Sequence, residues 1–431
     1  MKKVELLAPA GDMEKLKTAL HFGADAVYFA GKKFGLRAFS KNFENLAEPI
    51  NYCHEHSAKA YVTVNAYMRD SDYVSLADYL KELEALGADG IIVADLGVME
   101  LAGRVAPNLD VHVSTQANIT NLQTAMAYAR LAKAKRVVLA RELSLAEVEN
   151  ISKGLAKIGV ETEVFVHGAM CISYSGRCLL SNYMTGRDSN RGECVQACRF
   201  SYCLTENSAG KANENREKLS YPIGEDERGT YILNSKDLCL VNHLQEILDA
   251  GVSSLKIEGR MKSPYYVGSV VNVYRRALDE ILLGKKDTRI GKENRVKELE
   301  KTSHREFTTG FMFADGKIRQ NYRSSYQTQD ANFIALVLDN KNGELKLEMR
   351  NRFKVGDKLE ILSSSDAHNE VVTVEKITDE NGNEVLDAKN VQQKLFVKFK
   401  APKSALNLVT EGDILRSIKE KAKCEISYLL L

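Results

Sequence analysis

Short apolar runs alternate with helical patterns along the first 260 residues of the chain. Between most of these runs, apolar residues recur at helical spacing, as at Leu76, Leu80 and Leu83. Apolar strands that are each followed by a helix predict a parallel sheet covered on both faces. About eight such units fit an α/β fold of the (βα)8 TIM-like barrel type better than an open doubly wound sheet. The runs assigned to strands are Val4–Leu7, Ala26–Phe29, Tyr61–Val64, Ile91–Ala94, Val111–Val113, Val137–Ala140, Val164–Val166, Ile232–Leu233 and Leu255–Ile257.

A different pattern begins at about Asp330, where short strand-like segments are separated by turn sequences such as Asn342-Gly343. Alternating strands joined by such turns predict a small carboxyl-terminal β-barrel. The predicted strands are Asn332–Leu338, Glu344–Met349, Lys358–Leu362, Val371–Ile377 and Leu395–Phe399. We therefore predict a TIM-like barrel over 1–285, a helical linker over 286–330 and a small β-barrel over 331–420. Within the first domain, 171–198 holds a cysteine cluster and 199–230 is a polar excursion at the barrel mouth.

Composition narrows the class of protein. The 431 residues are 44% hydrophobic and 27% charged, with a net charge of +2, so a nucleic-acid surface has to be a local patch. No apolar run is long enough to span a membrane, and the first apolar stretch already breaks at Asp12, so no secretion signal is expected. Eight cysteines without such a signal indicate reduced thiols or metal ligands. We expect a cytoplasmic protein.

Polar and charged residues follow several predicted strands, where a TIM-like barrel keeps its functional groups. They include Asn65, Ser114-Thr115-Gln116, Arg141, His167-Gly168, Asn234-Ser235-Lys236-Asp237 and Lys256-Ile257-Glu258-Gly259-Arg260. Charges on a barrel strand are unfavourable unless they are paired or face a polar mouth. Two interpretations follow: an ion-pair network that closes the barrel, or a site for a small anionic molecule.

The most informative stretch follows the predicted strand Val164–Val166 and holds four cysteines at spacings of 7, 16 and 4. They are Cys171, Cys178, Cys194 and Cys198. Only the last pair has the spacing of a zinc knuckle. A Fe–S cluster needs convergent thiolates and nearby cations, which Arg177, Arg191 and Arg199 can supply. Isolated Cys53 and Cys424 fit buried apolar positions, and Cys203 and Cys239 are reserve ligands.

Several phrases resemble the collagenase-like U-32 peptidase family over essentially the whole chain. They are Leu6–Gly11, Glu163–Cys171, Ser175–Ser181, Arg191–Arg199, Asn234–Leu238, Lys256–Arg260 and Phe307–Phe311. Within that family the chain is most similar to prephenate-dependent tRNA uridine hydroxylases, which convert the wobble uridine to 5-hydroxyuridine. The resemblance implies a tRNA partner, prephenate as oxygen donor, a 4Fe–4S cluster on the four cysteines, and a homo-oligomer or a hetero-oligomer with a family paralogue.

The candidate site residues combine the strand ends with this resemblance. We assign catalytic roles to His167, Lys256 and Glu258. Arginine binds carboxylates bidentately, which suits a dicarboxylate such as prephenate. The predicted substrate-binding residues are Arg37, Arg141, Arg177, Asn234, Lys236 and Arg260, and Arg37 is also a candidate for a phosphate contact.

A basic stretch is the candidate RNA-binding surface. Residues 256–305 hold 13 Lys and Arg against 7 Asp and Glu, and the centre of this stretch is Arg275, Arg276, Lys285 and Lys286. Local positive charge attracts a polyanion, so we predict that these residues hold the body of the tRNA. The alternative is a solvated helix face.

Two rival functions remain open from the sequence. The first is a metal-dependent peptidase or collagenase, as the family name implies. However, the two histidines of His54-Glu55-His56 are too close to form a His-Glu-x-x-His zinc site, and no Gly-x-Ser-x-Gly sequence occurs. The second rival is a non-catalytic RNA-binding scaffold whose cysteines hold a structural zinc.

Overall fold

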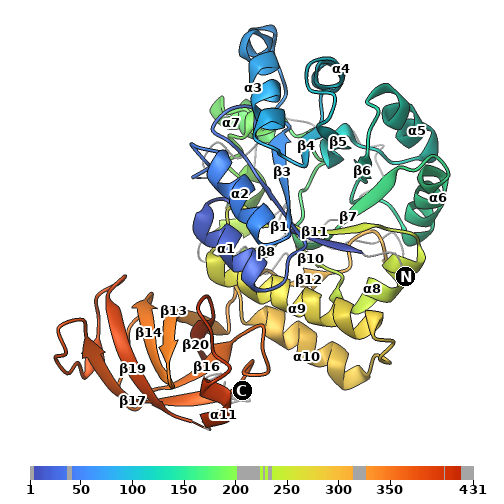
Figure 1. Cartoon of the computed structure of the whole chain (residues 1–431). Coiled ribbons are helices and arrows are strands. Elements are labelled where there is room, and N and C mark those ends of the chain that lie inside the picture. Colours follow the sequence, from blue (N-terminus) through green and yellow to red (C-terminus); the bar gives the residue numbers. More distant parts are fainter. Residues whose placement is uncertain are drawn as a thin grey trace, which may run out of the picture.

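A computed structural model describes residues 4–35, 41–200, 224–226, 229–231, 235–313, 327–401 and 403–418. Its first domain is a closed barrel of eight parallel strands, in which the last strand pairs with both the first and the seventh (Figure 1). The strands are β1 Glu5–Pro9, β2 Ala26–Phe29, β3 Lys59–Val64, β4 Gly90–Val93, β5 Asp110–Val113, β6 Arg136–Val138, β7 Glu161–Ala169 and β11 Ser254–Ile257. The predicted TIM-like α/β barrel is confirmed.

Helices cover the outside of this barrel (Figure 1). Outward side chains of the strands pack with the helices into one large apolar core, while Leu7, Tyr28, Tyr61 and Ile92 form a smaller cluster with Ala26. The helices are α1 Met13–His21, α2 Ala47–Glu55, α3 Tyr73–Ala85, α4 Leu96–Val105, α5 Leu122–Leu131, α6 Leu145–Ala156, α7 Leu180–Thr185, α8 Leu244–Asp249, α9 Pro264–Leu282 and α10 Arg289–Glu300. Within the described part of the chain, no helix has the length and apolarity needed to cross a membrane.

Local sequence explains where these helices begin and end. Asp12 and Asp95, each just beyond a strand, accept hydrogen bonds from the backbone N–H groups of Lys15 and Val98 in the first turn of α1 and α4. Such caps satisfy donors that the helix itself leaves unpaired. After α1, Gly23 has φ of 97°, the left-handed conformation that glycine adopts without strain and that commonly ends a helix.

One strand assignment was wrong. The phrase Asn234–Asp237 does not follow a barrel strand; instead β10 (Asp237–Cys239) begins there and runs antiparallel to the end of β7, outside the closed barrel. The eighth parallel strand is β11. Ile232 and Leu233 lie outside the described residues, and the preceding short strands β8 (Gly224–Asp226) and β9 (Gly229–Tyr231) pair only with each other. Within the predicted linker, α10 is helical, but β12 (Phe307–Thr308) pairs with β10.

The second domain is a closed antiparallel barrel of six strands, as the alternating pattern predicts. Its inward side chains, such as Val337, Leu347 and Ile361, form a separate apolar core. The six strands are β13 Ala331–Lys341, β14 Glu344–Met349, β16 Lys358–Leu362, β17 Val371–Asp379, β19 Lys394–Lys400 and β20 Ile414–Ile418, accompanied by β15 Phe353–Lys354, β18 Asp387–Ala388 and α11 Lys403–Leu406.

Ion pairs join the second barrel to α10. The guanidinium of Arg416, which is fully buried, lies 2.6 Å from Glu298, and Lys301 lies 2.7 Å from Glu360. Tyr265 on α9 stacks on Phe333 with ring centroids 5.8 Å apart. These buried ion pairs oppose movement of the second barrel against α10, because breaking any pair leaves a charge uncompensated.

Candidate functional site: a cysteine-lined pocket

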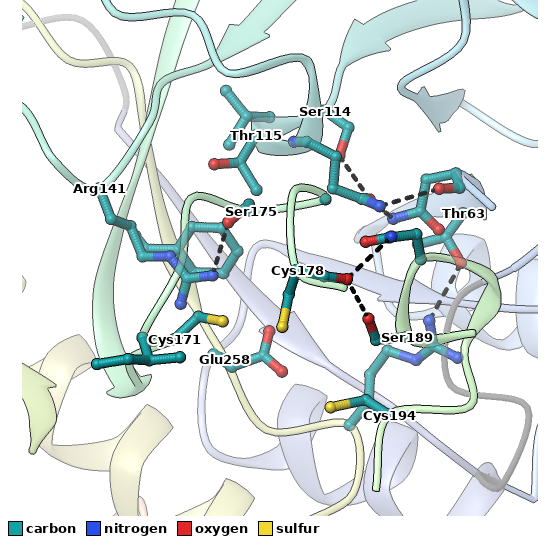
Figure 2. A pocket seen from close by; sticks show the side chains of 18 of the residues that line it. Thr63, Ser114, Thr115, Arg141, Cys171, Ser175, Cys178, Ser189, Cys194 and Glu258 are labelled. Atoms are coloured by element: carbon teal, nitrogen blue, oxygen red, sulfur yellow. Dashed lines mark hydrogen bonds between the residues drawn. The ribbon is translucent and has the colours of Figure 1, made fainter. Parts of the chain in front are cut away.

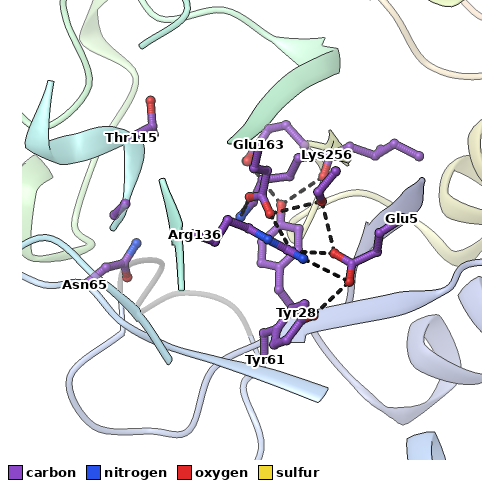
Figure 3. A network of polar contacts seen from close by, with 12 residues as sticks. Glu5, Tyr28, Tyr61, Asn65, Thr115, Arg136, Glu163 and Lys256 are labelled. Atoms are coloured by element: carbon purple, nitrogen blue, oxygen red, sulfur yellow. Dashed lines mark hydrogen bonds and ion pairs between the residues drawn. The ribbon is translucent and has the colours of Figure 1, made fainter. Parts of the chain in front are cut away.

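A polar network occupies the inside of the α/β barrel (Figure 3). The guanidinium of Arg136 donates to Glu163 at 3.1 Å and to Glu5 at 3.2 Å, and the ammonium group of Lys256 donates to the other oxygen of Glu163 at 2.7 Å. Tyr61 donates to Glu5 at 2.8 Å. Because Glu163 is fully buried, its two cationic partners are needed to keep it ionised.

The electrostatics of Glu163 follow from this packing. Burial alone would raise the pKa of its carboxyl, but Lys256 and Arg136 hold that pKa below the usual value. Lys256 therefore takes part in the ion-pair network that the sequence allowed as one interpretation. Its ammonium group also lies 4.5 Å from the centre of the Tyr28 ring, and both residues line the cavity above the network. The network thus forms the floor of a site as well as closing the barrel.

This cavity has a volume of about 180 Å³ and lies at the carboxyl ends of the barrel strands (Figure 2). Functional groups of TIM-like barrels gather at this end. Residues from most of the barrel strands or the loops after them reach it, and the loop after β7 forms its other wall. The polar residues of the strand side are Thr63, Asn65, Ser114, Thr115, Gln116, Arg141, Lys256, Glu258 and Arg260.

All four predicted cysteine ligands line this cavity: Cys171, Cys178, Cys194 and Cys198. We call residues 170–200 the cysteine segment and the cavity the cysteine pocket. In Figure 2 the sulfur atoms of three of them project towards the space beside Glu258. Cys53 and Cys239, by contrast, are buried and do not line the pocket. Cys203 and Cys424 lie outside the described residues.

Hydrogen bonds hold the two halves of the cysteine segment together. The carbonyl of Cys178 accepts from Ser189 Oγ at 2.7 Å and from Asn190 Nδ2 at 3.1 Å (Figure 2). Ser181, on α7, lies 3.9 Å from the sulfur of Cys194. The loop after β3 clamps the segment from outside, because Arg191 pairs with Asp72 at 2.8 Å. These contacts fix both cysteine pairs on the same side of the barrel mouth.

The donor set fits a Fe–S cluster. Four thiols line one small cavity, with the cationic Arg141, Lys256 and Arg260 on the opposite wall to balance the charge of thiolates. In a 4Fe–4S cluster each thiolate binds a different iron atom, so the sulfurs surround the cluster rather than meet at one point. Among the described residues, no three His, Cys, Asp or Glu side chains are arranged as ligands of a single metal ion.

Hydrogen bonds and packing fix the side chains of Arg141 and Arg260. Arg141 donates to the carbonyl of Ala169 at 2.9 Å and to Ser175 at 3.1 Å, and its guanidinium lies 4.7 Å from the centre of the Phe165 ring. Arg260 donates to Thr63 at 3.2 Å and is only 4% exposed. A guanidinium fixed in this way loses little side-chain entropy when it binds a carboxylate.

Glu258 and His167 differ in their access to the pocket. Glu258 lines it and accepts a hydrogen bond from Tyr28 at 3.3 Å. Its backbone packs against Gly168, where φ is 112° and any Cβ would lie 2.7 Å from the carbonyl of Glu258. His167 does not line the pocket: its ring is buried beside Tyr274, 3.3 Å from the hydroxyl. Burial lowers the pKa of His167 to about 3, so the imidazole is neutral.

The other predicted substrate-binding residues lie away from the pocket wall or cannot be placed. Arg37 and Asn234 lie outside the described residues. Arg177 is exposed on the cysteine segment and is not part of the lining. Lys236 is paired with Glu306 and does not reach the cavity.

Sequence reasoning missed a group of cations behind Cys198. Arg305 is 5% exposed, and its Nη1 lies 3.6 Å from Asp237, beyond hydrogen-bonding distance. Within the described part of the chain, Nε and Nη1 of Arg305 make no hydrogen bond. Burial, together with the positive charges of Arg305 and Arg199, lowers the pKa of Lys262 to about 8. These residues share no recognisable spacing with the cysteines, so only the fold brings them together.

The predicted RNA-binding residues divide into two kinds. Arg275 pairs with Asp25 at 3.1 Å. Arg276 donates to backbone carbonyls of the second domain, including that of Ser365 at 2.7 Å, and thus joins the two domains. Lys285 and Lys286 are exposed after α9. The arginines therefore have a structural explanation, whereas the lysines remain candidates for phosphate contact.

The histidines of the His54-Glu55-His56 phrase form no site with the cysteines. His54 lies 2.9 Å from Asp89 and His56 lies 2.8 Å from the carbonyl of Tyr52, both at the exposed end of α2. Neither lines the cysteine pocket.

Comparison with known proteins agrees with the resemblance seen in the motifs. The chain is 41% identical over 418 residues to the tRNA hydroxylation protein P1 of Bacillus subtilis, covering 95% of each chain. It is 35% identical over 318 residues to a 23S rRNA 5-hydroxycytidine synthase of Escherichia coli, covering 72% of this chain and 46% of that protein. It is 33% identical over 294 residues to a collagenase of Porphyromonas gingivalis, covering 66% and 67%. Residues 11–322 match the model of peptidase family U32 and residues 329–416 match that of its C-terminal domain, so the chain belongs to peptidase family U32.

Proposed function

We propose that this protein hydroxylates RNA, and specifically that it converts the wobble uridine of tRNA to 5-hydroxyuridine with prephenate as oxygen donor. The observation that carries the proposal is the cysteine pocket, where four thiols face fixed cations at the mouth of the barrel. Relatives named for hydroxylation of tRNA and for 5-hydroxycytidine synthesis in rRNA support the reaction class.

In this proposal Cys171, Cys178, Cys194 and Cys198 hold a 4Fe–4S cluster. When bound, such a cluster supplies one-electron chemistry at the pocket wall. The chain's own contribution is to bring the four thiols to one cavity and to surround them with positive charge. Arg191, through its pair with Asp72, keeps the second cysteine pair in position.

The small substrate binds on the strand side of the pocket. Prephenate has two carboxylates, and Arg141 and Arg260 are the guanidinium groups that line the cavity. Charge-assisted hydrogen bonds are strong in such a confined site. Glu258 is the carboxylate placed to exchange a proton with a bound substrate, and Tyr28 orients it by a hydrogen bond. Lys256 remains paired with Glu163 in the floor and adds positive charge next to the substrate.

A single nucleotide of the RNA enters the pocket. A base can react at a ring carbon only after it leaves its stack and enters a pocket. The exposed Lys285 and Lys286 are proposed to contact phosphates of the tRNA body.

Anaerobic purification and a single-turnover reaction test this proposal. Protein prepared without oxygen should contain iron and acid-labile sulfide and should form 5-hydroxyuridine in a tRNA transcript when prephenate is added. Omitting prephenate should stop the reaction. Iron-free protein that forms the product at the same rate would exclude the cluster, and no product under any condition would exclude the hydroxylase assignment.

A peptidase is the second candidate, because one relative is named a collagenase. The same preparation should be tested for gelatin degradation, with Cys178→Ala and Arg260→Gln as controls. Gelatin degradation that survives further purification and is lost in these variants would favour a peptidase.

A further inference from the structure

The exposed aromatic side chains of this protein are concentrated on the cysteine segment. Among the described residues, the aromatic side chains that are exposed are Tyr174 at 50%, Tyr183 at 86% and Phe200 at 41%, and all three belong to residues 170–200. Leu179 at 69% adds to them. Exposed large apolar residues that gather on one segment favour an interaction site more than singly scattered ones do.

Helix α7 exposes large apolar side chains and buries a polar one, which reverses the usual pattern at these positions. Ser181 points inward, is 1% exposed and contacts the sulfur of Cys194. Leu179 and Tyr183 are four residues apart, which places both on one helix face, and both are exposed. A surface helix normally buries its apolar face. The reversal indicates that the outer face of α7 has a partner that is not part of the described fold.

The exposed aromatic residues are close along the chain to residues that line the cysteine pocket. Tyr174 adjoins Ser175, and Tyr183 is two residues from Ser181; both serines line the cavity. Phe200 donates its backbone N–H to the carbonyl of Ala197, another lining residue, at 3.0 Å. In Figure 1, α7 lies far from α10 and the second barrel. The exposed rings are therefore available to whatever approaches the mouth, not to the domain interface.

Charge identifies the kind of partner. Residues 170–200 contain four arginines against two acidic residues. Arg191 is paired with Asp72, whereas Arg177 and Arg187 are exposed. A partner that combines negative charge with flat apolar faces is single-stranded nucleic acid, whose bases stack on aromatic side chains while its phosphates meet arginine. A protein partner would need acidic and apolar groups in the same alternation.

We propose that Tyr174, Tyr183 and Phe200 form a stacking platform for the unpaired nucleotides on either side of the nucleotide that enters the cysteine pocket. This inference rests on the proposed RNA substrate and adds the surface that holds its loop. It also places the main contact with unpaired RNA at the pocket mouth, whereas the basic stretch after α9 contacts only the stem.

The test uses a synthetic anticodon stem-loop RNA with 2-aminopurine next to the wobble uridine, because the fluorescence of this base is quenched when it stacks. Wild-type protein should quench it. Tyr183→Leu, which keeps apolar area but removes the ring, should weaken binding roughly 5- to 100-fold and abolish most of the quenching. Tyr183→Phe should retain both. Leu131→Ala, at a residue 70% exposed on α5, is the matched control and should bind as wild type does.

Three results would overturn the platform. Equal affinity and quenching in Tyr183→Leu and in a Tyr174→Leu, Phe200→Leu double variant would show that the rings do not stack on RNA. A wild-type oligomer that dissociates in these variants would assign the surface to a second copy of the chain. Equal binding of a fully paired duplex would remove the preference for unpaired bases. Product formation measured in the same samples separates these failures from failure of the proposed function, since a hydroxylase without the platform still forms 5-hydroxyuridine at saturating RNA.

Discussion

The floor of the α/β barrel and the cysteine pocket above it are both rich in polar and charged groups. The two regions differ in how completely these groups are hydrogen-bonded. In the floor, Glu5 and Glu163 are bound by Arg136, Lys256 and neighbouring hydroxyl groups at 3.2 Å or less. At the pocket, the sulfur of Cys194 accepts only a long contact from the hydroxyl of Ser181, at 3.9 Å, within the described part of the chain. Buried nitrogens of Arg305 and Arg199 make no hydrogen bond to any described residue.

This difference separates structural charge from functional charge. Buried ions that satisfy one another mainly hold the fold in one arrangement. Polar groups that are fixed but incompletely satisfied have remaining capacity for a ligand, and active sites are where such groups occur. Tyr28 connects the two regions, because its ring contacts Lys256 and its hydroxyl binds Glu258.

The largest effect is expected from the pocket cysteines. Replacing Cys171, Cys178, Cys194 or Cys198 singly by alanine should abolish iron binding and RNA hydroxylation, because a missing thiolate leaves one iron open to solvent. Iron content and product mass measure this. The control is Cys53→Ala, a buried position outside the pocket. Full iron content in all four variants would contradict the ligand assignment.

A matched pair of arginine substitutions compares the two regions directly. Arg136→Met should lower the free energy of unfolding by about 3–5 kcal/mol, because it leaves Glu163 and Glu5 buried without their shared partner. Arg305→Met should lower it by only about 1 kcal/mol, since Nη1 lies 3.6 Å from Asp237 and, among the described residues, Nε and Nη1 make no hydrogen bond. Denaturant unfolding measures both. Equal losses would show that the floor and the pocket do not differ in the way described.

Arg260→Gln should weaken binding of prephenate about 10- to 150-fold, the value of a charge-assisted hydrogen bond, and should change the affinity for tRNA little. Isothermal titration of each ligand gives the comparison. Arg104→Gln, at an exposed pair on α4, is the control. If prephenate bound the Arg260 variant normally, this residue would belong to the structural charges of the floor.

A smaller effect concerns pH. Burial holds the pKa of His167 at about 3, below its usual value of 6.5. Between these values the unfolded chain binds a proton that the folded chain does not, so the free energy of unfolding falls as the pH falls. The contribution is about 1.4 kcal/mol per pH unit. His167→Gln should reduce the slope by about this amount between pH 5 and 6. An unchanged slope would mean that the imidazole is not buried as described.

The architecture was readable from the sequence because the strands of a parallel barrel are buried on both faces and therefore appear as apolar runs. The short strand Asp237–Cys239 was not predicted, and Asp237 was placed at the end of a strand rather than at its beginning. Three residues carry no periodicity, and a charged residue begins this strand. The charged floor was foreseen only at Lys256. Glu5 stands inside a predicted strand and Glu163 next to one, a signal that was present but was not used.

The site was predicted unevenly for a similar reason. Four clustered cysteines are visible in sequence, and the fold brings all four to one cavity. His167 comes two residues after Phe165, which lines the cavity, but it faces away from the cavity. The pairing of β7 with β11 shifts register between Phe165 and His167, which interrupts the alternation of side chains. Arg305 comes close to Cys198, and Lys262 to Arg305, only through the tertiary fold, so no local pattern could reveal them.

The central claim is that the pocket modifies a uridine of tRNA. Mass spectrometry of nucleosides from total tRNA of a strain lacking this gene tests it most directly. We predict that 5-hydroxyuridine and its derivatives disappear, return with the wild-type gene, and do not return with the Cys178→Ala gene although that protein accumulates. An unchanged nucleoside profile, in a strain without a second copy of this family, would contradict the account.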